Sequence, residues 1–130
     1  GFYYRLFYYK ETSNWKVIQN LLDNRFKEKG MDDANWWNTQ AWDVYEKCDD
    51  PALIESAITW IHAVCEKDRD YNYLDTYAAL LFKAGKLQEA EAKAKEAIEV
   101  GKAAGNKVEG TEKLLEKIQE ALQKKETPSR

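Results

Sequence analysis

A chain of 130 residues is long enough to bury the core of one domain. Only two prolines and six glycines, with 33% charged and 13% aromatic residues, favour long helices over a turn-rich β fold. The net charge is −3, and residues 31–75 carry eleven acidic against three basic groups. This acidic centre argues against nucleic acid as the main partner, because phosphates bind to a basic face. No apolar run approaches the roughly 18 residues needed to span a membrane.

Residues 1–30 are predicted to form two N-terminal helices, the first of them dense in aromatic side chains. We expect this first helix to be covered by the rest of the domain or by a neighbouring segment, with an exposed patch for a partner as the alternative. Ser13 is predicted to cap the second helix, which ends near Gly30. Helical spacing divides the first helix into one side with Tyr3, Leu6, Phe7 and Lys10 and an opposite side with Tyr4 and Tyr8.

Residues 33–69 are predicted to form a first, irregular pair of helices. Asp32 or Asp33 caps its first helix, and Asp50 followed by Pro51 marks the start of its second. Apolar residues recur at the helical period on both. The predicted buried sides carry Ala34, Trp37, Ala41, Val44, Tyr45 and Cys48, and then Leu53, Ala57, Trp60, Ile61, Val64 and Cys65.

Residues 72–104 show the clearest pattern, that of two antiparallel helices joined at Gly85. A left-handed cap after the first helix favours glycine at this position. Small residues recur where the two helices must cross closely, at Ala78, Ala90, Ala94 and Ala97. A last helix over residues 111–124 has one apolar side and is otherwise rich in Glu and Lys, as expected of a capping helix. The tail 124–130 is expected to fray.

The helix pair at residues 72–104 resembles a tetratricopeptide repeat at Ala78, Lys83-Ala84-Gly85, Ala90, Ala97-Ile98 and Val100. It departs from the consensus at Leu74, where the family has Trp, and at Ala94, where an aromatic residue is preferred. Residues 57–65 repeat the pattern of residues 90–98 at an offset of 33. The resemblance implies an all-α, tetratricopeptide-like stack of antiparallel helix pairs, forming one domain over residues 1–130. An ordinary Ala-rich helix hairpin is the alternative.

The sequence contains no recognisable catalytic constellation. Its single histidine, His62, has no Ser or Cys placed for activation. Cys48 and Cys65 match neither a zinc spacing nor a redox Cys-x-x-Cys motif, so we expect them to pack as small apolar residues, with a disulfide between them as the alternative. The acidic pairs at 32–33 and 49–50 precede helices, where carboxylates cap free amides. We predict a non-catalytic chain without cofactor or metal.

The tetratricopeptide resemblance also implies a concave groove, lined by the first helix of each pair, that binds a protein or peptide partner. Asn amides pair with a peptide backbone and aromatic rings accept apolar side chains. The alternative is that the N-terminal helices bury Trp42 and Tyr45. A subset of the family clamps the C-terminal carboxylate of a peptide with Lys and Arg side chains in this groove. Lys83 is the one such residue at these positions, so this specific activity is not expected. Carried over by position, the predicted peptide-binding residues are Asn35, Asn38, Trp42 and Tyr45 of the first pair, beside Glu46, and Asn72, Asp75, Phe82 and Lys83 of the second, beside Ala79.

A second resemblance covers residues 38–122 and rests on the segments Asn38–Glu46, Asp49-Asp50-Pro51 and Leu74–Leu81. These are similar to a helical region found C-terminal to thioredoxin-like domains in Bacteroides-type bacteria. The resemblance implies an accessory domain of a larger redox protein, located in the periplasm or cell envelope rather than the cytoplasm. The chain begins at Gly1 without an initiator Met, and we expect it to be a fragment. A dimerisation module built on the aromatic N-terminus is a third hypothesis, with the oligomeric state open.

Overall fold

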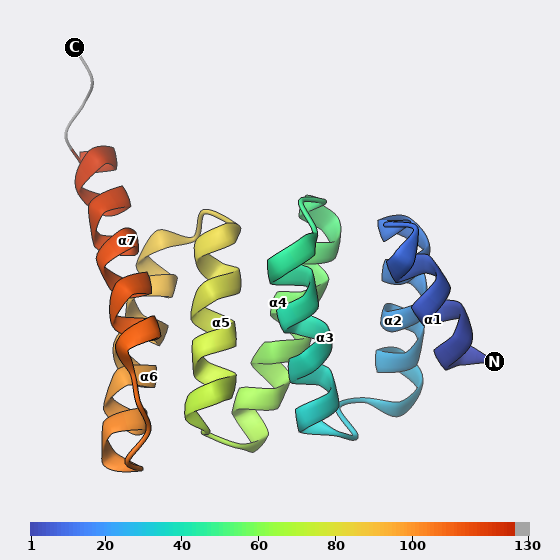
Figure 1. Ribbon diagram of the computed structural model, residues 1–130, viewed down its shortest axis with the longest axis horizontal. Helices are drawn as coiled ribbons and strands as arrows, with labels where there is room; N and C mark the ends of the chain where they lie inside the picture. Colours follow the sequence, from blue (N-terminus) through green and yellow to red (C-terminus); the bar gives the residue numbers. More distant parts are fainter. Residues whose placement is uncertain (127–130) are drawn as a thin grey trace.

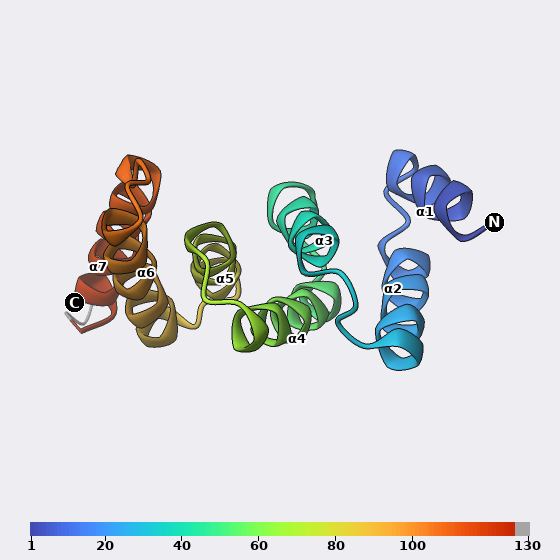
Figure 2. The same cartoon turned by 90° about the horizontal axis from the view of Figure 1, so that it is seen from below.

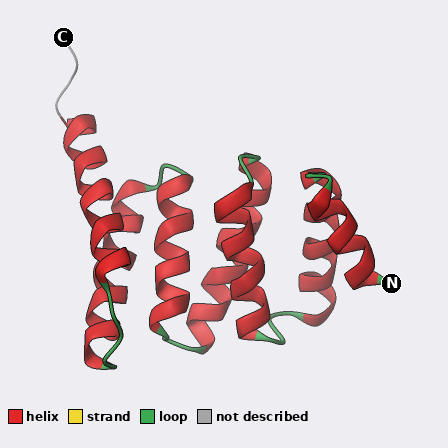
Figure 3. Cartoon of the chain, viewed as in Figure 1, coloured by secondary structure: helices red, strands yellow, loops and turns green. Residues whose placement is uncertain are grey.

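The structure, a computed structural model, describes residues 1–126, with side chains through Lys125, and this part of the chain is all-α (Figures 1 and 3). Residues 127–130 of the expected frayed tail lie outside the described residues. The helices are α1 (Phe2–Glu11), α2 (Trp15–Lys29), α3 (Ala34–Lys47), α4 (Pro51–Lys67), α5 (Tyr71–Lys83), α6 (Leu87–Ala103) and α7 (Glu109–Glu126).

Consecutive helices run in opposite directions and stack side by side along the molecule (Figure 1). α1 packs on α2, α3 on α4 and α5 on α6, and α7 closes the far end against α5 and α6. Seen from below, α1, α3 and α5 lie in one row and α2 and α4 in another (Figure 2). The prediction of an all-α stack of antiparallel helix pairs is confirmed.

Aspartates begin the helices of the first pair as predicted. The Asp33 carboxylate accepts a hydrogen bond from the backbone N–H of Trp36 at 3.1 Å, and the Asp50 carboxylate accepts one from Ala52 at 3.0 Å. Each bond satisfies one of the amides that a helix start leaves without an intrahelical partner. Asp32 has a different role, since its carboxylate accepts from the indole N–H of the buried Trp37 at 3.0 Å.

The cap of α2 corrects the prediction at its N-terminus. Asn14, and not Ser13, caps this helix, with the Asn14 side chain accepting from the backbone N–H of Val17 at 3.4 Å. Ser13 has a φ of 53° and therefore lies in the left-handed region. A helix cap normally has extended backbone, so this conformation removes Ser13 from the capping position.

The turn at Gly85 has the geometry that its glycine predicts. Gly85 has a φ of 78°, and its N–H donates to the carbonyl oxygen of Phe82 at 3.0 Å. The N–H of Lys86 donates to the carbonyl oxygen of Leu81 at 2.9 Å. These two bonds form a Schellman motif, which satisfies carbonyls that the end of α5 would leave free. The chain reverses here and α6 packs back on α5.

The core runs through the stack and is centred on two buried tryptophans. Trp37 of α3 and Trp60 of α4 are fully buried, with ring centroids 5.3 Å apart. Cys48 and Cys65 are free thiols, so the alternative of a disulfide is wrong. Burial raises the pKa of both thiols, that of Cys65 to about 12. At neutral pH both cysteines therefore stay protonated and unreactive.

Helix α1 is covered by the described domain on one side only. Leu6 is its buried residue, with Phe2 and Tyr9 packed beside it against the core. Tyr3 and Phe7, which share the side of Leu6 by helical spacing, are mostly exposed, as are Tyr4 and Tyr8. Because nearly every side chain of this helix is apolar or aromatic, its sequence carries little amphipathic signal to indicate which side faces inward. Cover of the outer side by a neighbouring segment or by a partner stays a prediction.

Candidate functional site

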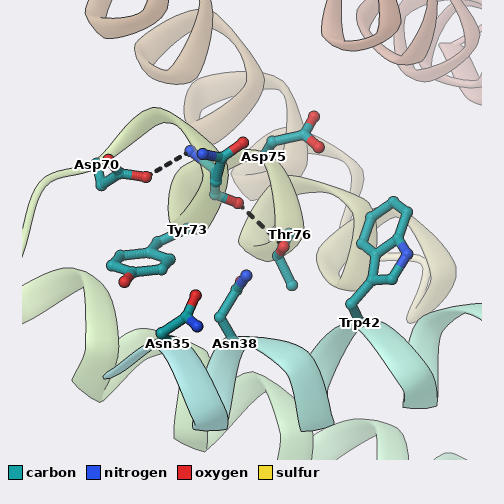
Figure 4. Close-up of a pocket in the computed structure, with 8 residues that line it drawn as sticks. Asn35, Asn38, Trp42, Asp70, Tyr73, Asp75 and Thr76 are labelled. Atoms are coloured by element: carbon teal, nitrogen blue, oxygen red, sulfur yellow. Dashed lines mark hydrogen bonds between the residues drawn. The ribbon is translucent and has the colours of Figure 1, made fainter. Parts of the chain in front are cut away.

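A cleft of about 430 Å³ opens between the first halves of α3 and α5. Both helices are the first members of their pairs, and they lie next to each other in the stack (Figures 1 and 2). Asp33 and Asp70 cap the two helices at the same end of the molecule, so their first turns face each other. We name this feature the α3–α5 cleft; it is lined by Asn35, Asn38, Trp42, Asp70, Asn72, Tyr73, Asp75 and Thr76 (Figure 4).

The α5 side of the cleft is ordered by short local hydrogen bonds. The Asp70 carboxylate accepts from the backbone N–H of Asn72 at 2.8 Å, and the Thr76 hydroxyl donates to the carbonyl oxygen of Asn72 at 3.0 Å (Figure 4). Thr76 is buried, whereas the Asn72 side chain is exposed. Both bonds hold backbone groups in place and leave the Asn72 amide group available to a ligand.

Three asparagines bring amide groups to the cleft from both helices. Asn35 and Asn38 of α3 point toward α5 (Figure 4). Asn72 lines the cleft from α5. The Oδ1 atom of Asn38 is buried and forms no hydrogen bond within the described residues. An amide offers two donors and an acceptor, the groups that a peptide backbone requires. Because the Asn38 oxygen is buried, it is not accessible to a ligand, whereas the side chains of Asn35 and Asn72 are exposed.

Two aromatic rings flank these amides. Tyr73 lies above Asn35 near one end of the cleft, and Trp42 stands at the other (Figure 4). Both rings are partly exposed. The Trp42 ring is supported from behind by Tyr45, with ring centroids 4.9 Å apart. The cleft therefore combines polar walls with apolar ends, a pattern typical of sites that orient a ligand by a few polar contacts.

Carboxylates gather around the Tyr73 end of the cleft. Burial raises the pKa of the Tyr73 phenol, and the negative charges of Asp70, Asp68 and Asp33 raise it further. Their effect on Tyr73 shows that these three groups act on the same region. This part of the cleft therefore favours a cationic ligand group over an anionic one.

Asp75 lines the cleft, but its carboxylate is bonded to α7. In Figure 4 this carboxylate points away from Asn35 and Asn38. It accepts a hydrogen bond from the hydroxyl of Thr111 in α7 at 2.6 Å, and the Tyr71 hydroxyl lies 2.7 Å from the same Thr111 oxygen. Since Thr111 has one hydroxyl hydrogen, Tyr71 donates to it. Burial raises the pKa of Asp75, and the Thr111 bond opposes this shift.

The structure brings together five of the eight predicted site residues and separates three. The five are Asn35, Asn38, Trp42, Asn72 and Asp75. Tyr45, Phe82 and Lys83 do not line the cleft but lie toward the other ends of α3 and α5. Lys83 donates to the backbone carbonyl oxygen of Tyr45 at 2.6 Å. Lys83 therefore joins the end of α5 to the end of α3, and ligand binding by Tyr45, Phe82 and Lys83 stays a prediction.

The N-terminal helices do not fill the cleft. All its lining residues belong to α3 or to α5, apart from Asp70, which caps α5. Helix α1 contacts α3 on another side, where Lys10 donates to the side chain of Gln40 at 2.6 Å and to that of Asp43 at 2.8 Å. The alternative in which these helices bury Trp42 is therefore wrong.

Sequence reasoning missed Asp70, Tyr73 and Thr76, which also line the cleft. Thr76 follows Asn72 by four residues and Tyr73 by three, so the three share one side of a helix. The same spacing rule, started from Asn72, would have selected this side. Asp75, three residues after Asn72, was chosen correctly by this rule, whereas Phe82 and Lys83 lie about three turns further along α5, beyond the cleft.

Other site types find no support in the described residues. No three His, Cys, Asp or Glu side chains come close enough together there to hold a metal ion. Of the described helices, none combines the length and apolar character needed to cross a membrane. Comparison with known protein families, with curated proteins and with solved structures finds no match to this chain. What the chain does is therefore inferred from the chemistry of its cleft and its surface.

Proposed function

We propose that this protein is a non-catalytic interaction module whose α3–α5 cleft binds an extended peptide segment of a partner protein. We further propose that this segment carries a Lys or Arg side chain. The observation that supports the proposal is the convergence of three asparagine amides, from two helices, on one open cleft between aromatic rings. The resemblance to tetratricopeptide repeats adds to it, because α3 and α5 correspond to the helices that line the groove in that family.

The asparagines are suited to hold the backbone of an extended segment. Asn35 and Asn72 are exposed on opposite walls, and the Asn38 acceptor between them is buried without a partner in the described chain. The exposed Asn35 and Asn72 amides would bind carbonyl and N–H groups of the segment's backbone. Backbone recognition of this kind selects an extended conformation with little dependence on side-chain identity.

The acidic rim supplies the preference for a basic side chain. The Asp33, Asp68 and Asp70 carboxylates act on the region around Tyr73. A Lys or Arg side chain placed there gains attraction from the carboxylates and from the face of the Tyr73 ring. Residues 31–75 carry a net charge of −8, so basic segments are also steered toward this part of the surface.

The test is selection from a random peptide library on the wild-type protein, with counter-selection on the Asn72→Ala variant. We expect the selected peptides to be enriched in Lys or Arg. We expect Asn35→Ala and Asn72→Ala each to weaken their binding by about 3–10-fold, the loss of one hydrogen bond. Isothermal titration calorimetry measures the affinities. Since exposed rim charges are screened by salt, binding should also weaken as ionic strength rises.

The matched control is Asn24→Ala, the same substitution at an exposed position of α2 outside the cleft. It should leave the affinity unchanged. The proposal is wrong if no peptide is selected, or if selected peptides bind Asn35→Ala, Asn72→Ala and wild type equally. Peptides enriched in Asp or Glu would contradict the assigned charge preference.

A further inference from the structure

The outer side of α1 exposes a patch of aromatic rings at one end of the stack. Four side chains form it, and we name them the α1 aromatic face: Tyr3, Tyr4, Phe7 and Tyr8, which are 61%, 73%, 64% and 51% exposed. These are the large exposed hydrophobic residues of the described chain. Single exposed rings are common on protein surfaces, but a continuous group on one helix marks an interaction surface.

The two ends of the stack differ in the surfaces they present. α1 lies at one end and α7 at the other (Figures 1 and 2). The outer side of α7 is polar, since its exposed residues include Glu112, Lys113, Glu116, Lys117 and Glu120. A polar outer helix keeps the end of a stack soluble. The outer surface at the α7 end is therefore polar and suited to solvent, whereas the aromatic outer surface at the α1 end is suited to contact with a protein.

The α1 aromatic face is held rigidly, so that its rings are already positioned for a contact. The Arg25 guanidinium of α2 lies 4.9 Å from the centroid of the Phe2 ring and 5.5 Å from that of Tyr3, and its Nη2 donates to the Tyr3 hydroxyl at 3.2 Å. At the other end of α1, Lys10 bonds to Gln40 in α3. A preorganised surface loses little conformational entropy on binding.

The size of the face matches a symmetric contact between two copies. A fully exposed Tyr or Phe side chain presents on the order of 200 Å², so the four partly exposed rings present about 500 Å² in each copy. Two copies in contact would bury up to about 1,000 Å² in total, the lower limit of a specific interface. The same patch on both partners is what a two-fold axis requires.

The dipole of α1 favours one arrangement of the two helices. An antiparallel arrangement brings the positive end of one helix dipole to the negative end of the other, whereas a parallel arrangement places like ends together. With Phe7 and Tyr8 at the centre of an antiparallel contact, the exposed Tyr4 of each copy comes opposite the exposed Glu11 of the other.

We infer that the protein forms a two-fold symmetric dimer through the α1 aromatic face, with the two α1 helices antiparallel. The interface is small, and its dissociation constant is about 10–100 µM. The dimer leaves both α3–α5 clefts open, because α1 contacts α3 on a side away from the cleft. Two clefts in one particle would raise the avidity for a partner with repeated segments.

Sedimentation equilibrium from about 5 µM to about 500 µM, a range chosen to bracket that dissociation constant, tests the inference. We expect the mean mass to rise from monomer to dimer. Phe7→Glu places a charge at the centre of the contact and should weaken association at least about tenfold. Asn20→Glu makes the same change of charge at an exposed position of α2 and should not affect it. Because Phe7 is mostly exposed, circular dichroism should show an unchanged fold.

The direction of the helices is tested by disulfide cross-linking under mild oxidation. The double variant Tyr4→Cys with Glu11→Cys should cross-link two copies, whereas Tyr4→Cys alone should not. A chain that stays monomeric to about 500 µM, above the expected dissociation constant, would overturn the inference. A dimer that survives Phe7→Glu would overturn it too, since another surface would then mediate association. Cross-linking of Tyr4→Cys alone, or none in the double variant, would exclude the antiparallel arrangement.

Discussion

The side-chain nitrogen of Lys83 lies 2.6 Å from the backbone carbonyl oxygen of Tyr45 and 3.6 Å from the Asp49 carboxylate. Tyr45 is in the last turn of α3, where carbonyl groups have no partner within the helix. Lys83 therefore satisfies the end of α3 from the end of α5 and ties the two walls of the cleft together. The charge of Lys83 therefore stabilises the packing of α5 against α3.

Lys83→Met is expected to lower the free energy of unfolding by about 1–2 kcal/mol, since it leaves the Tyr45 carbonyl without its charged donor. Urea denaturation measures this change. Lys86→Met is the matched control: among the described residues the Lys86 side chain makes an exposed ion pair with Glu55, and its loss should cost less than about 0.5 kcal/mol. Equal losses in the two variants would contradict the role given to Lys83.

Arg25 joins α1, α2 and α3 by contacts that depend on its planar shape. Its guanidinium stacks on Phe2, Tyr3 and Trp36, each within 5.5 Å of the ring centroid. Arg25→Lys keeps the charge but loses the planar stacking, and we expect a loss of stability of about 1–2 kcal/mol. Limited proteolysis should then cut within α1 sooner. Lys27→Arg, at an exposed site of α2, should change neither stability nor cleavage.

Gly101 permits the end of α6 to pack closely against its neighbours. A Cβ atom at this position would lie 2.6 Å from a methyl group of Val108 and 2.7 Å from the ring of Tyr71. We expect Gly101→Ala to destabilise the protein by about 1–2 kcal/mol, because overpacking outweighs the better helix propensity of Ala. Thermal denaturation provides the measurement.

Gly110 serves as the control for this substitution. A Cβ atom at Gly110 meets nothing within 4 Å, and the residue lies near the start of α7. Gly110→Ala should therefore raise stability by up to about 1 kcal/mol. If Gly101→Ala were also stabilising, the close approach of α6 to Tyr71 would not be a real constraint on the fold.

Asp75 makes stability depend on pH. Burial raises its folded-state pKa above the ordinary value of 3.8, so its contribution to stability is complete below pH 3.8 and is lost as the pH rises through the folded-state pKa. Asp75→Asn removes the buried charge and keeps an oxygen to accept from Thr111. We expect this variant to be more stable than wild type at pH 7, with the advantage shrinking as the pH falls toward 3.8.

Urea denaturation of both proteins at several pH values between about 4 and 7 measures this advantage. In about this pH range the buried Asp75 carboxyl group is expected to titrate. A variant that is less stable than wild type at pH 7 would show that the Thr111 hydrogen bond, and not burial, dominates at this carboxylate. Asp49→Asn, which removes a fully exposed carboxylate, should show no comparable pH dependence.

Local features of the chain predicted the positions of most helices because they act within a few residues. The caps at Asp33, Asp50 and Gly85 form through bonds between groups two to five residues apart. Ser13 failed as a cap because Asn14 beside it competes for the same amides, and a choice between neighbours depends on the exact backbone path.

The sequence by itself determined an all-α chain of antiparallel pairs, with its acidic centre and the amides of Asn35, Asn38 and Asn72 on first helices. Helix caps and the spacing of apolar residues depend on residues close in sequence, and the net charge is a simple sum. All three can therefore be predicted without the tertiary structure. Only the tertiary structure decided how each helix is rotated about its axis. That rotation directs Tyr73 into the α3–α5 cleft, Lys83 onto α3, and the aromatic rings of α1 outward. A rotation of one residue, roughly 100°, exchanges such roles, and packing between helices distant in sequence sets it.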